Sequence, residues 1–208
     1  MIDQSTLITY VVIVLGFVFI PGPATLLTVA RAASSGTRVG IATGAGVAAG
    51  DIVHTAMAIV GISAVIAASA FLFSLIKYLG AAYLVYIGIR AILDRKPVAP
   101  GSGMISITAS TAFKQAIVSE ILNPKTAVFF LAFLPQFVKP ENGAVFLQLT
   151  ILGVLFVLLG LLSTVVFAIS AGSLGNFLRR NPAVLRWQGK VVGGIYCALG
   201  LRIAFQER

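Results

Sequence analysis

Six apolar stretches, each about twenty residues long or longer, account for nearly all of this 208-residue chain. They lie at roughly 7–30, 40–65, 70–92, 113–137, 143–170 and 186–205. About 20 apolar residues let a helix cross the hydrocarbon core of a bilayer, so each stretch can span a membrane with some tilt. The longest connections, about 93–112 and 171–185, are too short to fold alone. The sequence therefore predicts an all-α integral membrane protein of six transmembrane helices, with residues 1–208 forming one domain.

The composition agrees with a membrane protein and excludes a water-soluble domain. Charged residues make up 10% of the chain and hydrophobic residues 59%, whereas soluble domains carry about 25% charged residues. We expect the first stretch to be retained rather than cleaved as a signal peptide, because Asp3 precedes it without any Lys or Arg and no small-residue cleavage pattern follows. Cys197 is the single cysteine, so no intramolecular disulfide can form.

The basic residues predict how the chain is oriented. Ten of the fifteen flank the connections after the first, third and fifth stretches: Arg31, Arg38, Arg90, Arg95, Lys96, Lys114, Arg179, Arg180, Arg186 and Lys190. By the positive-inside rule these connections are cytoplasmic, and both termini then face outward. The net charge of +9 therefore indicates orientation and contact with anionic lipid, and not binding of nucleic acid.

Two short repeats divide the chain into similar halves. Lys-x-x-Gly-x-x-Tyr occurs at 77–83 and again at 190–196, 113 residues later, and Pro21 and Pro124 are 103 residues apart. The halves, about 1–97 and 105–208, hold three predicted spans each, so the second half enters the membrane from the opposite side. The sequence therefore predicts two inverted three-helix repeats.

Prolines interrupt the first and fourth stretches, in the segments 17–23 and 120–125. Because proline has no amide hydrogen, three carbonyls lose their helical partners, those of Phe17, Phe19 and Glu120. A single kink is compatible with packing alone, whereas paired interruptions in corresponding repeats are typical of a transporter's binding site. The candidate substrate-binding residues at the two breaks are therefore Pro21, Gly22, Pro23, Glu120, Asn123, Pro124 and Lys125.

Asp51 is a further candidate for substrate binding, because it lies near the centre of the second stretch. A carboxyl group there must face a cavity, find a partner or hold a proton. Helical periodicity places His54 on the same stripe, where it either relays a proton or packs as an ordinary buried histidine. The candidate proton-coupling residues are therefore Asp51, His54 and Glu120. Gly46 and Gly50 lie on another face, where they favour close helix packing.

Other classes of function receive less support. No hydrolase or metalloprotease motif is found, and one histidine with one cysteine cannot form a usual zinc site. The sequence thus predicts no catalytic residue, no cofactor and no resident metal. Export of a divalent cation stays open as an alternative, since Asp51, Glu120 and Asn123 offer oxygen ligands, and an integral membrane enzyme is a weaker one. The apolar faces do not decide whether lipid or a second copy of the chain covers them.

Several motifs together resemble the LysE/RhtB superfamily over essentially the whole chain: Pro21-Gly22-Pro23, the glycine-rich 44–51, Asn123-Pro124-Lys125, Phe133-Leu134-Pro135-Gln136-Phe137 and Gly200-Leu201-Arg202. Members of this superfamily are bacterial inner-membrane exporters of amino acids. The resemblance is greatest to the homoserine/threonine branch. It implies efflux of an amino acid or a derivative in exchange for protons, and location in the inner membrane, where the outward-facing termini predicted from the basic residues would be periplasmic or extracellular.

Overall fold

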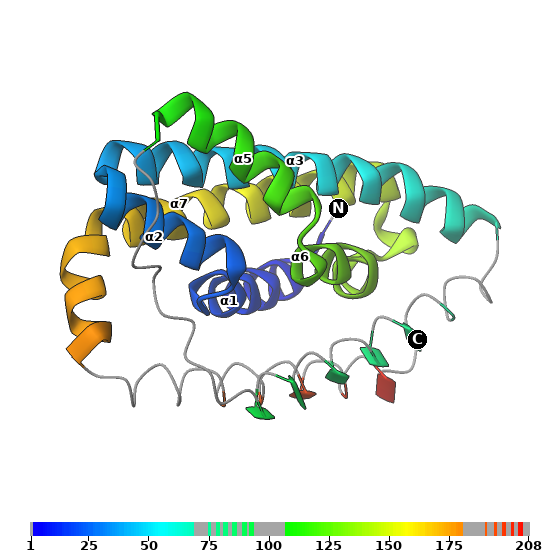
Figure 1. Ribbon diagram of the computed structural model, residues 1–208. Helices are drawn as coiled ribbons and strands as arrows, with labels where there is room; N and C mark the ends of the chain where they lie inside the picture. Colours follow the sequence, from blue (N-terminus) through cyan, green and yellow to red (C-terminus); the bar gives the residue numbers. More distant parts are fainter. Residues whose placement is uncertain are drawn as a thin grey trace.

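The computed structural model describes residues 2–68 and 107–180 continuously, with isolated positions between 75 and 93 and between 190 and 205. The two continuous segments are built of helices and short helical turns (Figure 1). In chain order these are α1 (Gln4–Phe19), α2 (Pro23–Ser35), α3 (Thr37–Ala68), α5 (Ala109–Ile121), α6 (Pro124–Val128), η1 (Phe129–Phe133), η2 (Leu134–Phe137), η3 (Pro140–Asn142) and α7 (Val145–Arg180).

Two to four membrane spans can be recognised in the described part. Single helices cover Thr37–Gly61 and Val145–Ala171 with enough apolar length to cross a bilayer. Two bent pairs qualify as broken spans, α1 with α2 at 51° and α5 with Pro124–Phe137 at 45°. The spans expected at 70–92 and 186–205, and both copies of the Lys-x-x-Gly-x-x-Tyr repeat, lie largely outside the described residues. The arrangement as six helices in inverted repeats therefore stays a prediction.

Both predicted helix breaks are confirmed. α1 ends at Phe19 and α2 begins at Pro23, while α5 ends at Ile121 and α6 begins at Pro124. Each proline starts a new helix at a position where a missing amide hydrogen costs nothing. Asn123 caps the second restart, because its Oδ1 accepts a hydrogen bond from Lys125 N at 3.1 Å.

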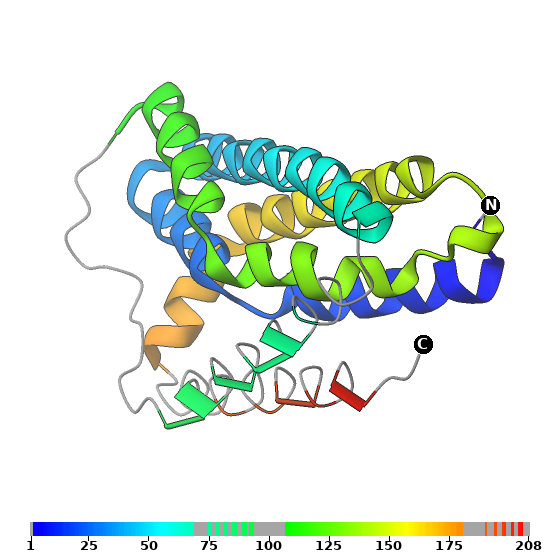
Figure 2. The ribbon, with the colours of Figure 1, turned by 90° about the vertical axis from the view of Figure 1, so that its right-hand side faces the viewer.

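Contacts at the two ends of the helices bring together connections that were predicted to lie on the same side of the membrane. Asp3 accepts a hydrogen bond from Thr6 N at 2.8 Å and pairs with Lys139 at 3.0 Å, so the N-terminus and the connection after the fourth predicted span share one end. At the other end, Ile107 N donates to Ser35 Oγ at 3.4 Å. Figure 2 shows these two ends. The bonds from Thr6 and Lys139 hold the pKa of the Asp3 carboxyl below its usual value, so the contribution of this cap to stability is present at neutral pH and is lost as the pH falls through that lowered pKa.

We predict that chemical labelling will report this orientation. With Cys197 replaced by serine, Asn142→Cys should react with an impermeant thiol reagent in intact cells, because its connection is predicted to face outward. Ser102→Cys should react only after the membrane is opened, because the connection that contains Ser102 is flanked by basic residues. The reverse labelling pattern would overturn the orientation while leaving the fold unaffected.

The predicted packing role of Gly46 and Gly50 is also confirmed. A methyl group at Gly46 would overlap the carbonyl of Phe113, and one at Gly50 would overlap the side chain of Glu120. The absence of side chains therefore lets α3 and α5 lie in direct contact, as Figure 1 shows. This close approach brings Glu120 beside Asp51 of α3.

An aromatic cluster fills the interior between α1, α7 and the end of the second broken helix. Phe129 stacks against Phe17 and Phe156 with ring centroids 4.6 and 4.7 Å apart. Tyr10 packs against Phe137 and donates its hydroxyl hydrogen to the carbonyl of Leu152 at 2.8 Å. This cluster holds α1, α7 and the end of the second broken helix together, and it fixes the positions of the two breaks relative to each other.

Candidate functional site

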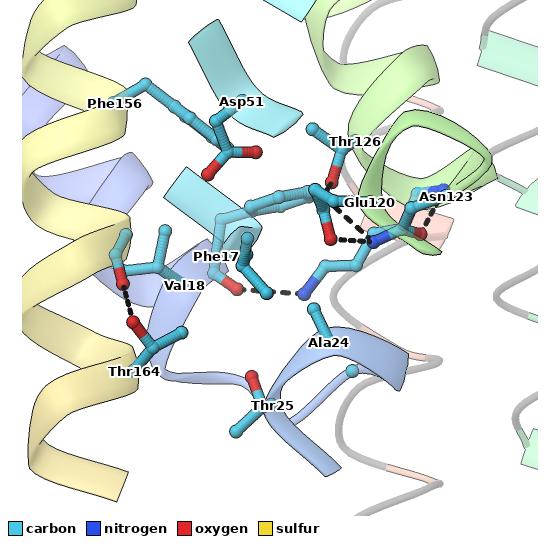
Figure 3. A pocket seen from close by; sticks show the side chains of 14 residues that line it. Phe17, Val18, Ala24, Thr25, Asp51, Glu120, Asn123, Thr126, Phe156 and Thr164 are labelled. Atoms are coloured by element: carbon cyan, nitrogen blue, oxygen red, sulfur yellow. Dashed lines mark hydrogen bonds between the residues drawn. The ribbon is translucent and has the colours of Figure 1, made fainter. Parts of the chain in front are cut away.

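A central cavity lies where the two broken helices meet α3 and α7 (Figure 3). About 40 Å³ of it is open to the centres of water molecules, which is room for about three waters. Five of the residues predicted from the sequence line it, namely Gly22, Asp51, Glu120, Asn123 and Lys125. The prolines shape the breaks without lining the cavity. His54 does not line the cavity either, and it contacts Glu120 of α5 instead.

Lys125 caps the end of the first broken helix. Its ammonium donates hydrogen bonds to the carbonyls of Phe17 at 3.1 Å and Ile20 at 3.2 Å, and lies 4.2 Å from the centroid of the Phe17 ring. The carbonyl of Phe17 is one that Pro21 was predicted to leave without a helical partner. A cation at this helix C-terminus is also favoured by the helix dipole. Glycine at position 22 makes room, since a methyl group there would lie 3.1 Å from the ammonium nitrogen.

His54 contacts the freed carbonyl at the second break, as Lys125 does at the first. Its Nε2 lies 2.9 Å from the carbonyl oxygen of Glu120, which can only accept, so this nitrogen donates the hydrogen. The ring stacks on Phe130 with centroids 5.8 Å apart. The freed carbonyls of Phe17 and Glu120 therefore each receive a nitrogen donor from the opposite half of the chain. Of the two alternatives left open for His54, this contact favours a structural one.

Two carboxyl groups meet at the top of the cavity in Figure 3. Asp51 and Glu120 are 3% and 2% exposed, and both side chains line the cavity. Asn123 Nδ2 donates to both carboxyl oxygens of Glu120 at 3.1 Å, and the hydroxyl of Thr126 donates to one of them. The cavity thus combines a buried carboxyl pair with one ammonium group.

Four hydroxyl residues at the site were missed by the sequence reasoning. Thr126 holds Glu120, Ser163 Oγ donates to the carbonyl of Val18 at 2.8 Å, and Thr25 and Thr164 line the cavity. Thr126 and Thr25 each follow a break by two residues, and that position could have identified them. Ser163 gives no such signal, because it lies within an otherwise regular span.

The described residues contain no group of three or more His, Cys, Asp or Glu side chains that could hold a metal ion. At the cavity, the acidic side chains are those of Asp51 and Glu120. The side-chain oxygen of Asn123 already accepts the amide hydrogen of Lys125.

Replacing Lys125 with methionine should destabilise the protein. Methionine keeps the length of the side chain but leaves the buried carbonyls of Phe17 and Ile20 without this donor, at a cost of about 1–3 kcal/mol. We expect the midpoint of thermal unfolding in detergent to fall by roughly 2–10 °C. Lys139→Met is the matched control: it removes an exposed ion pair and should shift the midpoint little. Equal shifts in the two variants would contradict a capping role for Lys125.

Comparison with known proteins assigns the chain to a family. The LysE type translocator family matches residues 15–207. An uncharacterized membrane protein of Vibrio cholerae is 29% identical over 97% of this chain and 98% of its own length. YrhP, an uncharacterized membrane protein of Bacillus subtilis, is 36% identical over 76% of this chain and 80% of its own. A leucine efflux protein of an Enterobacter species is 27% identical over 94% and 93%. No solved structure matches. The protein thus belongs to the family of LysE type translocators.

Proposed function

We propose that this protein exports an amino acid across the bacterial inner membrane in exchange for protons, and that the central cavity binds the substrate. The observation that carries the proposal is the buried Asp51–Glu120 pair at the meeting point of two broken helices. Broken helices with freed backbone groups are how membrane carriers bind small charged substrates at the middle of the bilayer. Membership of a translocator family and similarity to leucine efflux proteins support the same function.

The walls of the cavity suit an aliphatic amino acid. Phe17, Val18, Val47 and Phe156 supply apolar surface, and the carboxyl pair supplies a partner for the substrate ammonium. The open volume of about 40 Å³ is too small for a leucine side chain, since it holds only about three waters. Binding of a side chain of that size would therefore require the walls of the cavity to move apart.

The same carboxyl pair offers a simple means of coupling to protons. Two adjacent carboxylates in apolar surroundings repel each other, and a proton bound at Asp51 removes that repulsion when the cavity is empty. A bound ammonium group replaces the charge of that proton and allows it to leave. Substrate and proton then occupy the pair alternately, as exchange in opposite directions requires.

Transport into inverted membrane vesicles tests this function. Vesicles from cells that produce the protein should accumulate labelled L-leucine when their interior is made acidic, and vesicles without the protein should not. Labelled Mn²⁺, tested under the same gradient, addresses the alternative of cation export. Accumulation of Mn²⁺ without accumulation of any amino acid from a labelled mixture would overturn the proposal in favour of that alternative.

A further inference from the structure

One buried hydroxyl group is an exception among the threonines of the described residues. Five of the six buried threonines donate their hydroxyl hydrogen within the protein: Thr28 to Ala24, Thr43 to Val39, Thr55 to Asp51, Thr126 to Glu120 and Thr164 to Gly160. Thr25, only 6% exposed, has no such partner in the described part of the chain and lines the cavity instead. A buried polar group without a partner calls for a ligand or a bound water.

Thr25 lies in the first turn of α2, and the geometry of that turn explains its orientation. The residue four positions earlier is Pro21, which lies outside α2, so the usual bond to the preceding helical turn is not available. The first amide of α2 with a main-chain partner is that of Leu26, which donates to Gly22 at 2.9 Å. The amides of Ala24 and Thr25 precede it and lack carbonyl partners within the helix. The positive end of a 13-residue helix therefore faces the cavity together with the hydroxyl.

A positive charge lies beside the same turn. The ammonium of Lys125 would be 3.1 Å from a methyl group at Gly22, the residue that caps α2. The negative groups, Asp51 and Glu120, belong to α3 and α5. In Figure 3, Thr25 and Asp51 point into the cavity from opposite sides. The cavity thus has a positive wall and an acidic wall, which suits the two charges of an amino acid.

We propose that Thr25, the first-turn amides of α2 and Lys125 form the subsite for the α-carboxylate of the substrate. This inference rests on the proposed function, because it assumes that an amino acid enters the cavity. The substrate carboxylate accepts hydrogen bonds from the Thr25 hydroxyl and the free amides, and the Lys125 ammonium adds charge. The ammonium group of the substrate lies against Asp51 and Glu120, and the side chain contacts the apolar wall.

Exchange of labelled substrate in proteoliposomes tests the subsite without any pH gradient. The probes are labelled L-leucine and a labelled mixture of L-amino acids, and either reports on the subsite because every α-amino acid carries the same carboxylate. Thr25→Val keeps the shape of the side chain but removes its hydroxyl. We expect the half-saturating concentration to rise about tenfold or more, and Thr25→Ser to restore most of the loss. Thr28→Val is the matched control, since its hydroxyl bonds only to the helix backbone.

Leucinamide, which lacks the carboxylate, separates a carboxylate contact from a structural effect. As a competitor it should bind weakly to the wild type and equally weakly to Thr25→Val. Equal losses for leucine and leucinamide, or unchanged leucine exchange by Thr25→Val, would overturn the subsite while leaving the transport function in place. Failure of the wild type to exchange any amino acid in the mixture would instead overturn the proposed function and the subsite with it.

Discussion

Replacing Asp51 with asparagine is expected to abolish proton-driven accumulation of substrate while leaving the protein inserted and folded. Asparagine keeps the size of the side chain and part of its hydrogen bonding, but it cannot bind or release a proton. In proteoliposomes, an imposed difference of one pH unit can drive about tenfold accumulation per proton. We expect the wild type to approach that ratio with labelled L-leucine and the Asp51→Asn variant to equilibrate without accumulation.

Exchange of labelled for unlabelled substrate provides the internal control for this variant. Exchange needs binding and movement of the loaded carrier but no net transfer of protons, so Asp51→Asn should retain measurable exchange. Glu141→Gln, at an exposed acid in η3, should behave as the wild type in both assays. Full accumulation by Asp51→Asn would remove Asp51 from the coupling role and assign it to Glu120, for which Glu120→Gln is the corresponding test.

Replacing Pro124 with alanine should reduce transport about 10–100-fold, because small displacements of binding groups have effects of that size. Alanine restores an amide hydrogen that can bond to the carbonyl of Glu120 and straighten the break. That carbonyl now accepts from His54 Nε2 and from Asn123 N at 2.9 Å each. A straightened helix would displace both of these donors. Displacement of Asn123 would also remove the side-chain amide that holds the Glu120 carboxyl.

The initial rate of L-leucine transport per inserted molecule measures this effect, with insertion quantified by immunoblot of the membrane fraction. Pro140→Ala is the matched control, because Pro140 starts the exposed turn η3 and is not among the residues that line the cavity. A Pro124→Ala protein that inserts and transports at the wild-type rate would show that the break takes no part in the mechanism.

The breaks themselves were predictable from the sequence, while their partners were not. A missing amide hydrogen acts on the residue four positions earlier, so Pro21 and Pro124 identify the freed carbonyls of Phe17 and Glu120 by local chemistry alone. Which donor reaches each carbonyl depends on tertiary packing. Lys125 is 108 residues from Phe17, and His54 is 66 residues from Glu120.

The packing glycines and Thr25 illustrate the same limit. Gly46 and Gly50 were assigned correctly, because a pair of glycines one turn apart has few uses in a membrane helix other than close contact. Thr25 was missed, since threonines in helices normally bond to their own backbone. That its hydroxyl lacks the usual partner becomes visible only when the hydrogen bonds of all the buried threonines are compared in the structure.

The crossed caps at the two breaks have a mechanical consequence. Lys125 and His54 each tie one break to the opposite half of the chain, so a motion that separates the halves must break the contacts to both main-chain carbonyls together. A hydrogen bond between buried groups contributes about 0.5–1.5 kcal/mol. Part of the energy barrier between conformations would then come from contacts to backbone carbonyls. This part would be the same for every substrate. The rate of switching between conformations would accordingly depend on these contacts in the same way for the empty carrier and for every bound amino acid.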